Sequence, residues 1–267
     1  MIGILSHRKN FGSEVQRSKN ICYSSCNTNQ MNYIEFLKLS SRRLKSKEDY
    51  MQFQKFQAKW VISDSLKRFD LKAKNILDLG SGFGGYSQEL SNAGAHVYAI
   101  DLNIIRHPQK QVNFFQIKGD CNNLPIRSES MDLVFCSSLI EHVSDQEQLI
   151  LEINRVLKKQ GICYLSFPPF FSPVGGHQFK PFHMFGEGFA VTLSKFIYRL
   201  NVESYNTSYG NWGLYPTTIQ KVLKLVKHNN FKIIDITTRF SPLNFAKVPV
   251  FNEILTWHVE FIVQKNE

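Results

Sequence analysis

A glycine-rich turn between an apolar run and a helical pattern is the feature that most limits how this chain can fold. The stretch 75–90 reads NILDLGSGFGGYSQEL, and its apolar first part carries Asp78 as its only charge. A strand, a tight turn and a helix start in this order allow the backbone to approach a ligand closely. The stretch therefore predicts a ligand-binding loop at the end of a strand, built on the glycines Gly80, Gly82, Gly84 and Gly85.

Strand and helix patterns alternate on both sides of this loop. Strands are expected at 75–79, 96–101, 112–117, 132–137, 162–167, 231–238 and 254–263. Helices are expected at 86–93, from a capping-box pattern at Ser144 to about 157, and from Thr217 or Thr218 to about 228. Such alternation predicts an α/β fold, a doubly wound and mainly parallel seven-stranded sheet.

The N-terminal part differs in composition from the rest. Residues 1–48 hold nine Lys or Arg against three acids, more than half of the formal net charge of +10. We predict a basic and partly disordered extension over 1–48 and a catalytic domain over 49–267. Helices are expected at 31–44 and 48–69, and the second either packs on the sheet edge or caps the ligand pocket.

Five cysteines are an odd number, which favours reduced thiols in a cytosolic protein over a disulfide framework. Cys22 and Cys26 have the spacing of a ligand pair, but no second pair follows them, so no metal is expected there. The first residues are too short an apolar run for a signal peptide, and no stretch is long enough to span a membrane. The sequence predicts a soluble, cytoplasmic protein.

Two acids follow the expected second and third strands, where a doubly wound sheet binds its ligands. Asp101 comes 21 residues after Gly80 and is placed to accept the hydroxyls of a ribose. Asp120, followed by Cys121, is placed to read the edge of an adenine. Together with the glycine loop they predict an adenosine-bearing ligand. No lysine follows the glycines as in a P-loop, but Gly80, Gly82 and Gly85 also satisfy G-x-G-x-x-G, so NAD(P) stays an alternative.

At this point the sequence resembles the class I S-adenosylmethionine-dependent methyltransferases, in particular the type 11-like subgroup. The resemblance covers about residues 70–168. It rests on five blocks in chain order: the loop 78–84, the acid Asp101, Gly119-Asp120 with Leu124-Pro125, the strand 131–134, and the block LIEHV at 139–143.

The resemblance implies a role for each of these blocks. The cofactor would be S-adenosylmethionine, and the acceptor a small molecule or a lipid-like molecule. The cofactor-binding residues it implies are Asp78, Gly80, Ser81, Gly82 and Gly84 at the methionine moiety, Asp101 and Leu102 at the ribose, Asp120 and Cys121 at the adenine, and Ser137 or Ser138 beside the sulfonium.

Three histidines are candidates for a base that removes a proton from the acceptor: His142, His177 and His183. Of these His177 is preferred, and the alternative for each is a histidine that only shapes the pocket. His177 and His183 with a carboxylate do not have a metal-site spacing, so no metal is expected.

An aromatic-rich insertion, about 168–215, follows the expected fifth strand. It forms either a lid over an apolar or ring-bearing acceptor or a small core of its own. Its aromatic residues include Phe170, Phe171, Phe179, Phe182, Phe185, Tyr205, Tyr209, Trp212 and Tyr215.

Three rival functions are left open. A nucleic-acid methyltransferase would use the basic N-terminus, but the Asn-Pro-Pro-Tyr-like tetrad of base-methylating enzymes is missing after the fourth strand, which ends in Cys136-Ser137-Ser138-Leu139. Nucleic acid is therefore possible but not favoured. The other rivals are a binding module without turnover and an NAD(P) oxidoreductase. The methylated atom and the oligomeric state are not defined by the sequence.

Overall fold

The computed structural model describes residues 32–43, 45–103, 112–208, 213–239, 243–248 and 251–267. The chain divides into two compact units, 1–30 and 31–267, and only the second is described below. The expectations for Cys22, Cys26, Tyr209 and Trp212 lie outside the described residues. The domain boundary at residue 48 stays a prediction.

Seven strands form one sheet in the order β3-β2-β1-β4-β5-β7-β6. The pairs among the first five strands are parallel, whereas β7 runs antiparallel between β5 and β6. The chain reverses its direction of winding between β1 and β4, and such a switch point is where ligands bind in sheets of this kind. The doubly wound, mainly parallel seven-stranded sheet is confirmed. Its strands are β1 (Asn75–Leu79), β2 (His96–Asp101), β3 (Phe115–Lys118), β4 (Met131–Ser137), β5 (Leu157–Phe167), β6 (Phe231–Arg239) and β7 (His258–Lys265).

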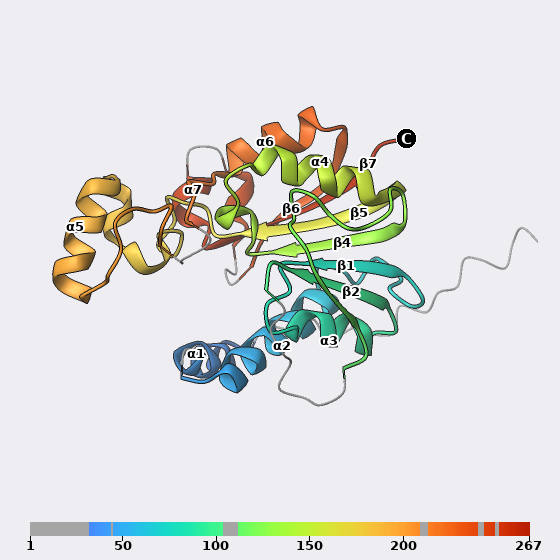
Figure 1. Ribbon diagram of the computed structural model, residues 1–267, viewed down its shortest axis with the longest axis horizontal. Helices are drawn as coiled ribbons and strands as arrows, with labels where there is room; N and C mark the ends of the chain where they lie inside the picture. The colour runs from blue at the N-terminus through green and yellow to red at the C-terminus, as the bar shows by residue number, and fades with distance from the viewer. Residues whose placement is uncertain (1–31, 44, 104–111, 209–212, 240–242, 249–250) are drawn as a thin grey trace, which may run out of the picture. The chain divides into compact units, whose positions relative to one another are not determined.

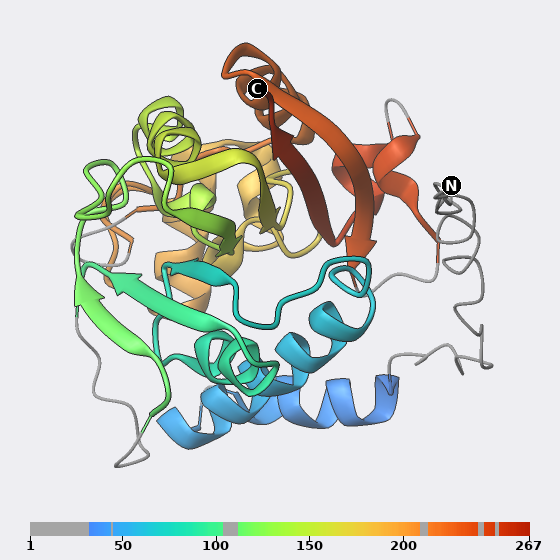
Figure 2. The ribbon, with the colours of Figure 1, turned by 90° about the vertical axis from the view of Figure 1, so that its right-hand side faces the viewer.

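Helices cover both faces of this sheet. α2 (Lys47–Ser63) and α3 (Gly85–Asn92) lie on one face, and α4 (Gln146–Val156) and α6 (Ile219–His228) on the other (Figures 1 and 2). The remaining helical elements are α1 (Tyr33–Arg42), α5 (Glu187–Tyr198) and α7 (Asn252–Leu255), with the 3-10 turns η1 (Ile140–His142), η2 (His177–Phe179), η3 (Phe182–Phe185) and η4 (Phe245–Lys247).

Each face of the sheet has its own apolar core because successive side chains of a strand point to opposite faces. In β1, Leu77 and Leu79 enter the core under α4 and α6, while Ile76 enters the core under α2 and α3. Such double burial is why the central strands are nearly continuous apolar runs. α3 and α4 directly follow the strands that carry the glycine loop and the LIEHV block, so the packing of these helices holds both segments in place.

Several element boundaries differ from the sequence expectation. The side chain of Asp145, rather than Ser144, caps α4 by accepting a hydrogen bond from the Gln148 N–H at 2.9 Å. β5 begins at Leu157, directly after α4, because Leu157 pairs with Met131 of β4. Likewise α7 occupies the first residues of the expected last strand, so β7 begins only at His258.

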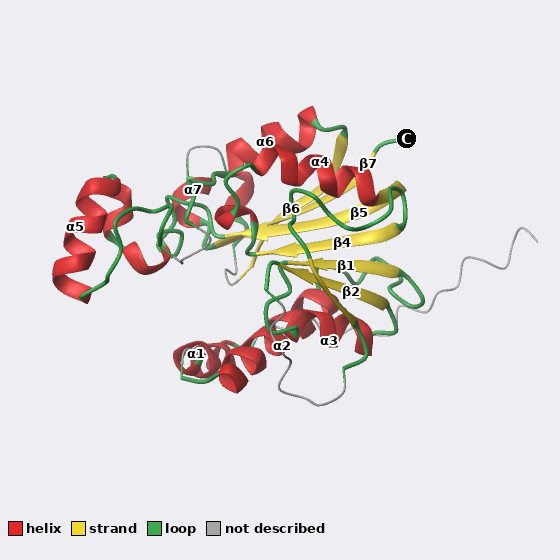
Figure 3. Cartoon of the chain, in the orientation of Figure 1, coloured by secondary structure: helices red, strands yellow, loops and turns green. Residues whose placement is uncertain are grey.

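In the insertion after β5, helix α5 lies away from the sheet (Figure 3). The insertion has a third, separate core. Phe179 is fully buried within it, beside Phe170 and Tyr205. Other rings of the same segment face outward, and Phe196 is 84% exposed. The insertion therefore builds its own small core and also presents apolar side chains on its surface. Among the described residues, no helix is both long enough and apolar enough to cross a membrane.

Candidate cofactor and acceptor site

The glycine loop between β1 and α3 adopts backbone conformations that favour glycine. Gly80, Gly82 and Gly84 have φ values of +74°, +53° and +77°, in the left-handed region. The N–H groups of Gly80 and Ser81 both donate to the carbonyl of Ile100, at 2.8 and 3.1 Å. A Cβ on Gly80 would lie 3.0 Å from Leu139 Cδ1. The loop thus passes closely over the ends of β1, β2 and β4.

Asp101, at the end of β2, lies against this loop. Its Oδ2 accepts the N–H of Gly82 at 2.9 Å, and its Oδ1 accepts the N–H of Asn103 at 3.1 Å. Leu102 follows with 44% of its surface exposed. The acid expected at the ribose is therefore beside the glycines, at the same edge of the sheet.

Asp78 lies buried at the end of β1. The Ser87 hydroxyl of α3 donates to its Oδ2 at 2.5 Å. Burial raises the pKa of Asp78 to about 7, the Ser87 hydrogen bond lowers it in part, and the charge of Asp101 raises it further. A nearby positive group, such as the ammonium of an amino acid, would stabilise the ionised form of this buried carboxyl.

Asp120 and Cys121 follow β3 at the same edge. Asp120 is exposed, and its Oδ1 accepts the N–H of Asn122 at 2.9 Å. The Cys121 side chain is buried, and burial raises the pKa of its thiol to about 12. The thiol is therefore an unreactive packing group, and only the backbone of Cys121 is suited to contact a ligand.

α2 covers the glycine loop on its outer side. A Cβ on Gly85 would lie 2.5 Å from Gln54 Cβ, and the rings of Tyr50 and Phe83 are 5.6 Å apart. The same helix buries Val61 in the core below. The helix therefore packs on the sheet and against the glycine loop, and its capping of the ligand pocket stays a prediction.

The chain beyond β4 contacts the end of β5 and the returning end of the insertion. The Ser138 N–H donates to the Ser166 carbonyl at 2.8 Å, and Ser138 has a φ of +54°. Further along, the Tyr215 N–H donates to the Glu141 carbonyl at 2.8 Å, and His142 Nδ1 donates to the Gly213 carbonyl at 2.7 Å. The returning end of the insertion is therefore fastened to η1.

Two of the three predicted histidines lie together. The rings of His142 and His177 are 4.9 Å apart and nearly perpendicular, and His177 Nε2 lies 3.9 Å from Glu141 Oε1. Burial lowers the pKa of His142 to about 4. Burial also lowers the pKa of His177 to about 3, and the positive neighbours His142, Lys180 and His183 add to that effect. The three groups Glu141, His142 and His177 have the donor types of a metal site.

His183 occupies a different place. It is buried in the insertion, where its Nε2 donates to the Ser172 carbonyl at 3.2 Å and its ring packs on Phe170 at 5.4 Å. Gly176 lies directly against the ring, since a Cβ there would come within 2.1 Å of it. This histidine supports the insertion from inside.

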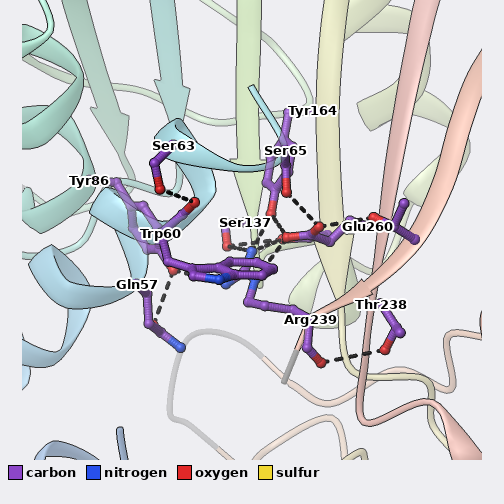
Figure 4. Close-up of polar contacts among 12 residues, drawn as sticks. Gln57, Trp60, Ser63, Ser65, Tyr86, Ser137, Tyr164, Thr238, Arg239 and Glu260 are labelled. Atoms are coloured by element: carbon purple, nitrogen blue, oxygen red, sulfur yellow. Dashed lines mark hydrogen bonds and ion pairs between the residues drawn. The ribbon is translucent and has the colours of Figure 1, made fainter. Parts of the chain in front are cut away.

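Sequence reasoning missed a buried ionic network behind Ser137 (Figure 4). Arg239, at the end of β6, is completely buried and pairs with Glu260 of β7 at 3.0 Å. Its guanidinium also donates to Ser166 Oγ at 2.8 Å and to Ser137 Oγ at 3.4 Å. The network connects β4, β5, β6 and β7 behind the site. The only available signal was a lone acid inside the apolar run HVEFIV.

These residues fit S-adenosylmethionine. A side chain at Gly80 or Gly85 would press on Leu139 or Gln54, so the loop depends on glycine at these positions. The buried Asp78 suits a cation, and Asp101 lies beside the loop. NAD(P) shares the glycine pattern, so comparison with known proteins decides between the two.

The family described as a methyltransferase domain, of type 11, matches residues 77–165. The biotin biosynthesis bifunctional protein BioHC of Cellvibrio japonicus is 36% identical over 101 residues, 36% of this chain and 20% of that protein. An uncharacterized methyltransferase of Mycobacteroides abscessus is 23% identical over 73% of this chain and 77% of its own length. A ubiquinone biosynthesis O-methyltransferase of Coxiella burnetii is 28% identical over 38% of this chain and 46% of its own. The chain thus spans less than half the length of two of these three relatives.

Solved structures agree on the fold. An S-adenosylmethionine-dependent methyltransferase from Mesorhizobium loti superposes with a TM-score of 0.54 at 16% identity, covering 78% of this chain and 98% of that one. Residues 77–165, which hold the glycine loop and the strand-end acids, match the type 11 methyltransferase domain, and the fold of the chain is that of S-adenosylmethionine-dependent methyltransferases.

Proposed function

We propose that this chain transfers a methyl group from S-adenosylmethionine to a small-molecule or lipid-like acceptor, bound where the end of β4 meets the insertion. One observation carries the proposal: a single short segment touches both sides of the site. Leu139 packs on the glycine loop, and two residues later Glu141 is hydrogen-bonded to the end of the insertion. An acceptor held by the insertion would therefore face the methionine end of the cofactor.

The cofactor side uses the residues expected from the family resemblance. The proposed contacts are Asp78, Gly80, Ser81, Gly82 and Gly84 at the methionine moiety, Asp101 and Leu102 at the ribose, Asp120 and Cys121 at the adenine, and Ser137 near the sulfonium. S-adenosylmethionine brings a methyl group that is already activated. The protein therefore has mainly to orient the acceptor in line with that group, and orientation alone can supply a large part of the rate.

The proposed acceptor side is formed mainly by apolar side chains of the insertion. An open hollow of about 380 Å³ in the insertion is lined mainly by apolar and aromatic side chains, among them Phe170, Phe171 and Tyr205. The ubiquinone biosynthesis relative supports a ring-bearing or lipid-like acceptor. Of the three histidines, His183 lines this hollow. His142 and His177 lie together in η1 and η2, and we propose that the reacting atom of the acceptor lies beside them. His183 would act only by shaping the insertion.

The test is transfer of a labelled methyl group to a fractionated cell extract. Wild-type protein is expected to label a small organic or lipid fraction, and a Gly80→Ala variant with a damaged cofactor loop is expected to label nothing. Label in RNA or protein would contradict the proposed acceptor class. Tight cofactor binding without transfer to any fraction would instead support a binding module.

A further inference from the structure

A carboxylate and two imidazoles converge where the insertion meets the end of β4. Glu141 and His142 lie in η1, and His177 begins η2 on the insertion. One ligand atom from each of the three residues lies within 4.8 Å of the other two. Residues 36 positions apart in the chain are therefore gathered into one small volume.

Glu141 is the first sign that this volume is built for a ligand. Its side chain is 2% exposed, and neither carboxylate oxygen has a hydrogen-bond partner within the described part of the chain. Burying such a group without partners is costly. The charge of Arg239 acts on Glu141, while the ion pair of Arg239 is with Glu260. A bound cation would supply the missing partner.

The orientation of His142 is the second sign. Its Nδ1 is 2.7 Å from the Gly213 carbonyl, and a carbonyl only accepts, so Nδ1 carries the hydrogen. The lone pair of the ring is then on Nε2. A second hydrogen bond that sets the tautomer in this way is typical of metal-binding histidines.

His177 contributes a third and independent observation. Its φ of +50° is in the left-handed region, which is uncommon for a residue other than glycine. Strain of this kind tends to persist where a side chain has to be held in one position for function. Its Nε2 is turned toward Glu141 Oε1 at 3.9 Å, and 22% of its side chain is exposed, which leaves the cluster open on one side.

We propose that Glu141, His142 and His177 form a binding site for one divalent cation of the zinc or manganese type. Two imidazole nitrogens and one carboxylate suit such ions better than calcium or magnesium, which prefer oxygen. Three protein ligands leave at least one coordination position open. If the function proposed above is right, that position takes an oxygen atom of the acceptor and holds it beside the cofactor.

The test measures cation binding alone, without cofactor or acceptor. The full chain is treated with chelator and titrated calorimetrically with Zn²⁺, Mn²⁺ and Mg²⁺. Wild-type protein is expected to bind one Zn²⁺ or Mn²⁺ per chain. Glu141→Gln and His177→Gln should each weaken that binding by about 10- to 100-fold or more. Loss of a residue that only supports a metal ligand costs about that much affinity, and loss of the ligand itself should cost at least as much. The matched control is His228→Gln, an 80% exposed histidine on α6, which should bind as wild type does.

A wild-type measurement guards against variants that fail to fold. Added Co²⁺ should shift the ring-proton resonances of His142 and His177 and leave those of His228 in place. Absence of binding, or binding that survives both substitutions, would overturn the site. A cation site without methyl transfer would contradict only the proposed function, and methyl transfer with no cation bound would contradict only the site.

Discussion

The two sides of this site are built in different ways. The cofactor side is local: its glycines lie within six residues, and their positions follow from backbone conformation and from packing against Leu139. The acceptor side is assembled from distant segments, with Glu141 bonded to Tyr215 and placed beside His177. If the acceptor binds where we propose, the insertion can change its acceptor contacts without altering the cofactor loop.

The two sides also differ in how they are supported. The loop rests on both main cores, and the buried Arg239–Glu260 network holds the strand ends behind it. The insertion rests on a small core of its own around Phe179. Regions with separate cores can open independently, so changes in the insertion should leave the cofactor side intact.

The largest effect is expected at Gly80. A Gly80→Ala substitution forces a side chain into the left-handed region, costing roughly 1–2 kcal/mol, and pushes against Leu139 at a further cost of about 1–3 kcal/mol. Displacement of the loop should weaken S-adenosylmethionine binding on the order of 100-fold, measured by calorimetry.

Gly188→Ala is the matched control, because a Cβ there meets nothing within 4 Å. It should leave cofactor affinity unchanged. Equal affinity in both variants would mean that the loop does not hold the cofactor.

Asp101→Asn should have the next largest effect. The carboxylate accepts the Gly82 N–H and, in our proposal, the ribose hydroxyls. Hydrogen bonds to a charged group contribute about 1.5–3 kcal/mol, so cofactor affinity should fall roughly 10- to 100-fold. The loss should be smaller for S-adenosylmethionine analogues that lack the ribose hydroxyls, and an equal loss for both would remove Asp101 from the ribose.

A pH effect of about tenfold is expected from Asp78. Its pKa in the ligand-free protein is raised to about 7, so the carboxyl is mainly protonated at pH 6 and mainly ionised at pH 8. A cationic ligand prefers the ionised form, and affinity for S-adenosylmethionine should therefore rise about tenfold between these values.

The stability of the free protein should change in the opposite direction. Because the folded pKa is above the unfolded value of about 3.9, the stabilising contribution is complete below that value and is lost as pH rises through 7. Asp78→Asn should flatten both profiles relative to wild type, in paired calorimetric and thermal-unfolding series. If the affinity of the wild-type protein for S-adenosylmethionine did not change with pH, Asp78 would not face the cationic group of the cofactor.

The fold could be predicted from the sequence because its signals are local. Apolar runs such as that of β4 and the turn after β1 define strands and loops within about ten residues. Predicted element boundaries were wrong where a contact between residues distant in sequence determines them. For example, β5 begins as early as Leu157 because this residue pairs with Met131. The antiparallel placement of β7 between β5 and β6 likewise has no local signal.

The candidate site divides in the same manner. Asp101 and the glycines could be located from spacing alone, and the structure places them together. Sequence reasoning named His142 and His177 but paired His177 with His183, since it could not show that the insertion folds back over η1. Arg239 was missed for the same reason, as its partner lies on another strand.

The smallest effect on cofactor binding is expected from the core of the insertion. Phe179→Ala removes a fully buried ring and should destabilise this segment by about 3–5 kcal/mol, seen as faster amide hydrogen exchange over 168–208. Phe196→Ala, an 84% exposed ring on α5, is the matched control and should leave exchange unchanged. Affinity for S-adenosylmethionine should stay within about twofold of wild type in both variants, because the loop does not rest on this core. A large loss of affinity in Phe179→Ala would mean that the two sides fold as one unit. The structure of the cofactor loop would then depend on the folded insertion.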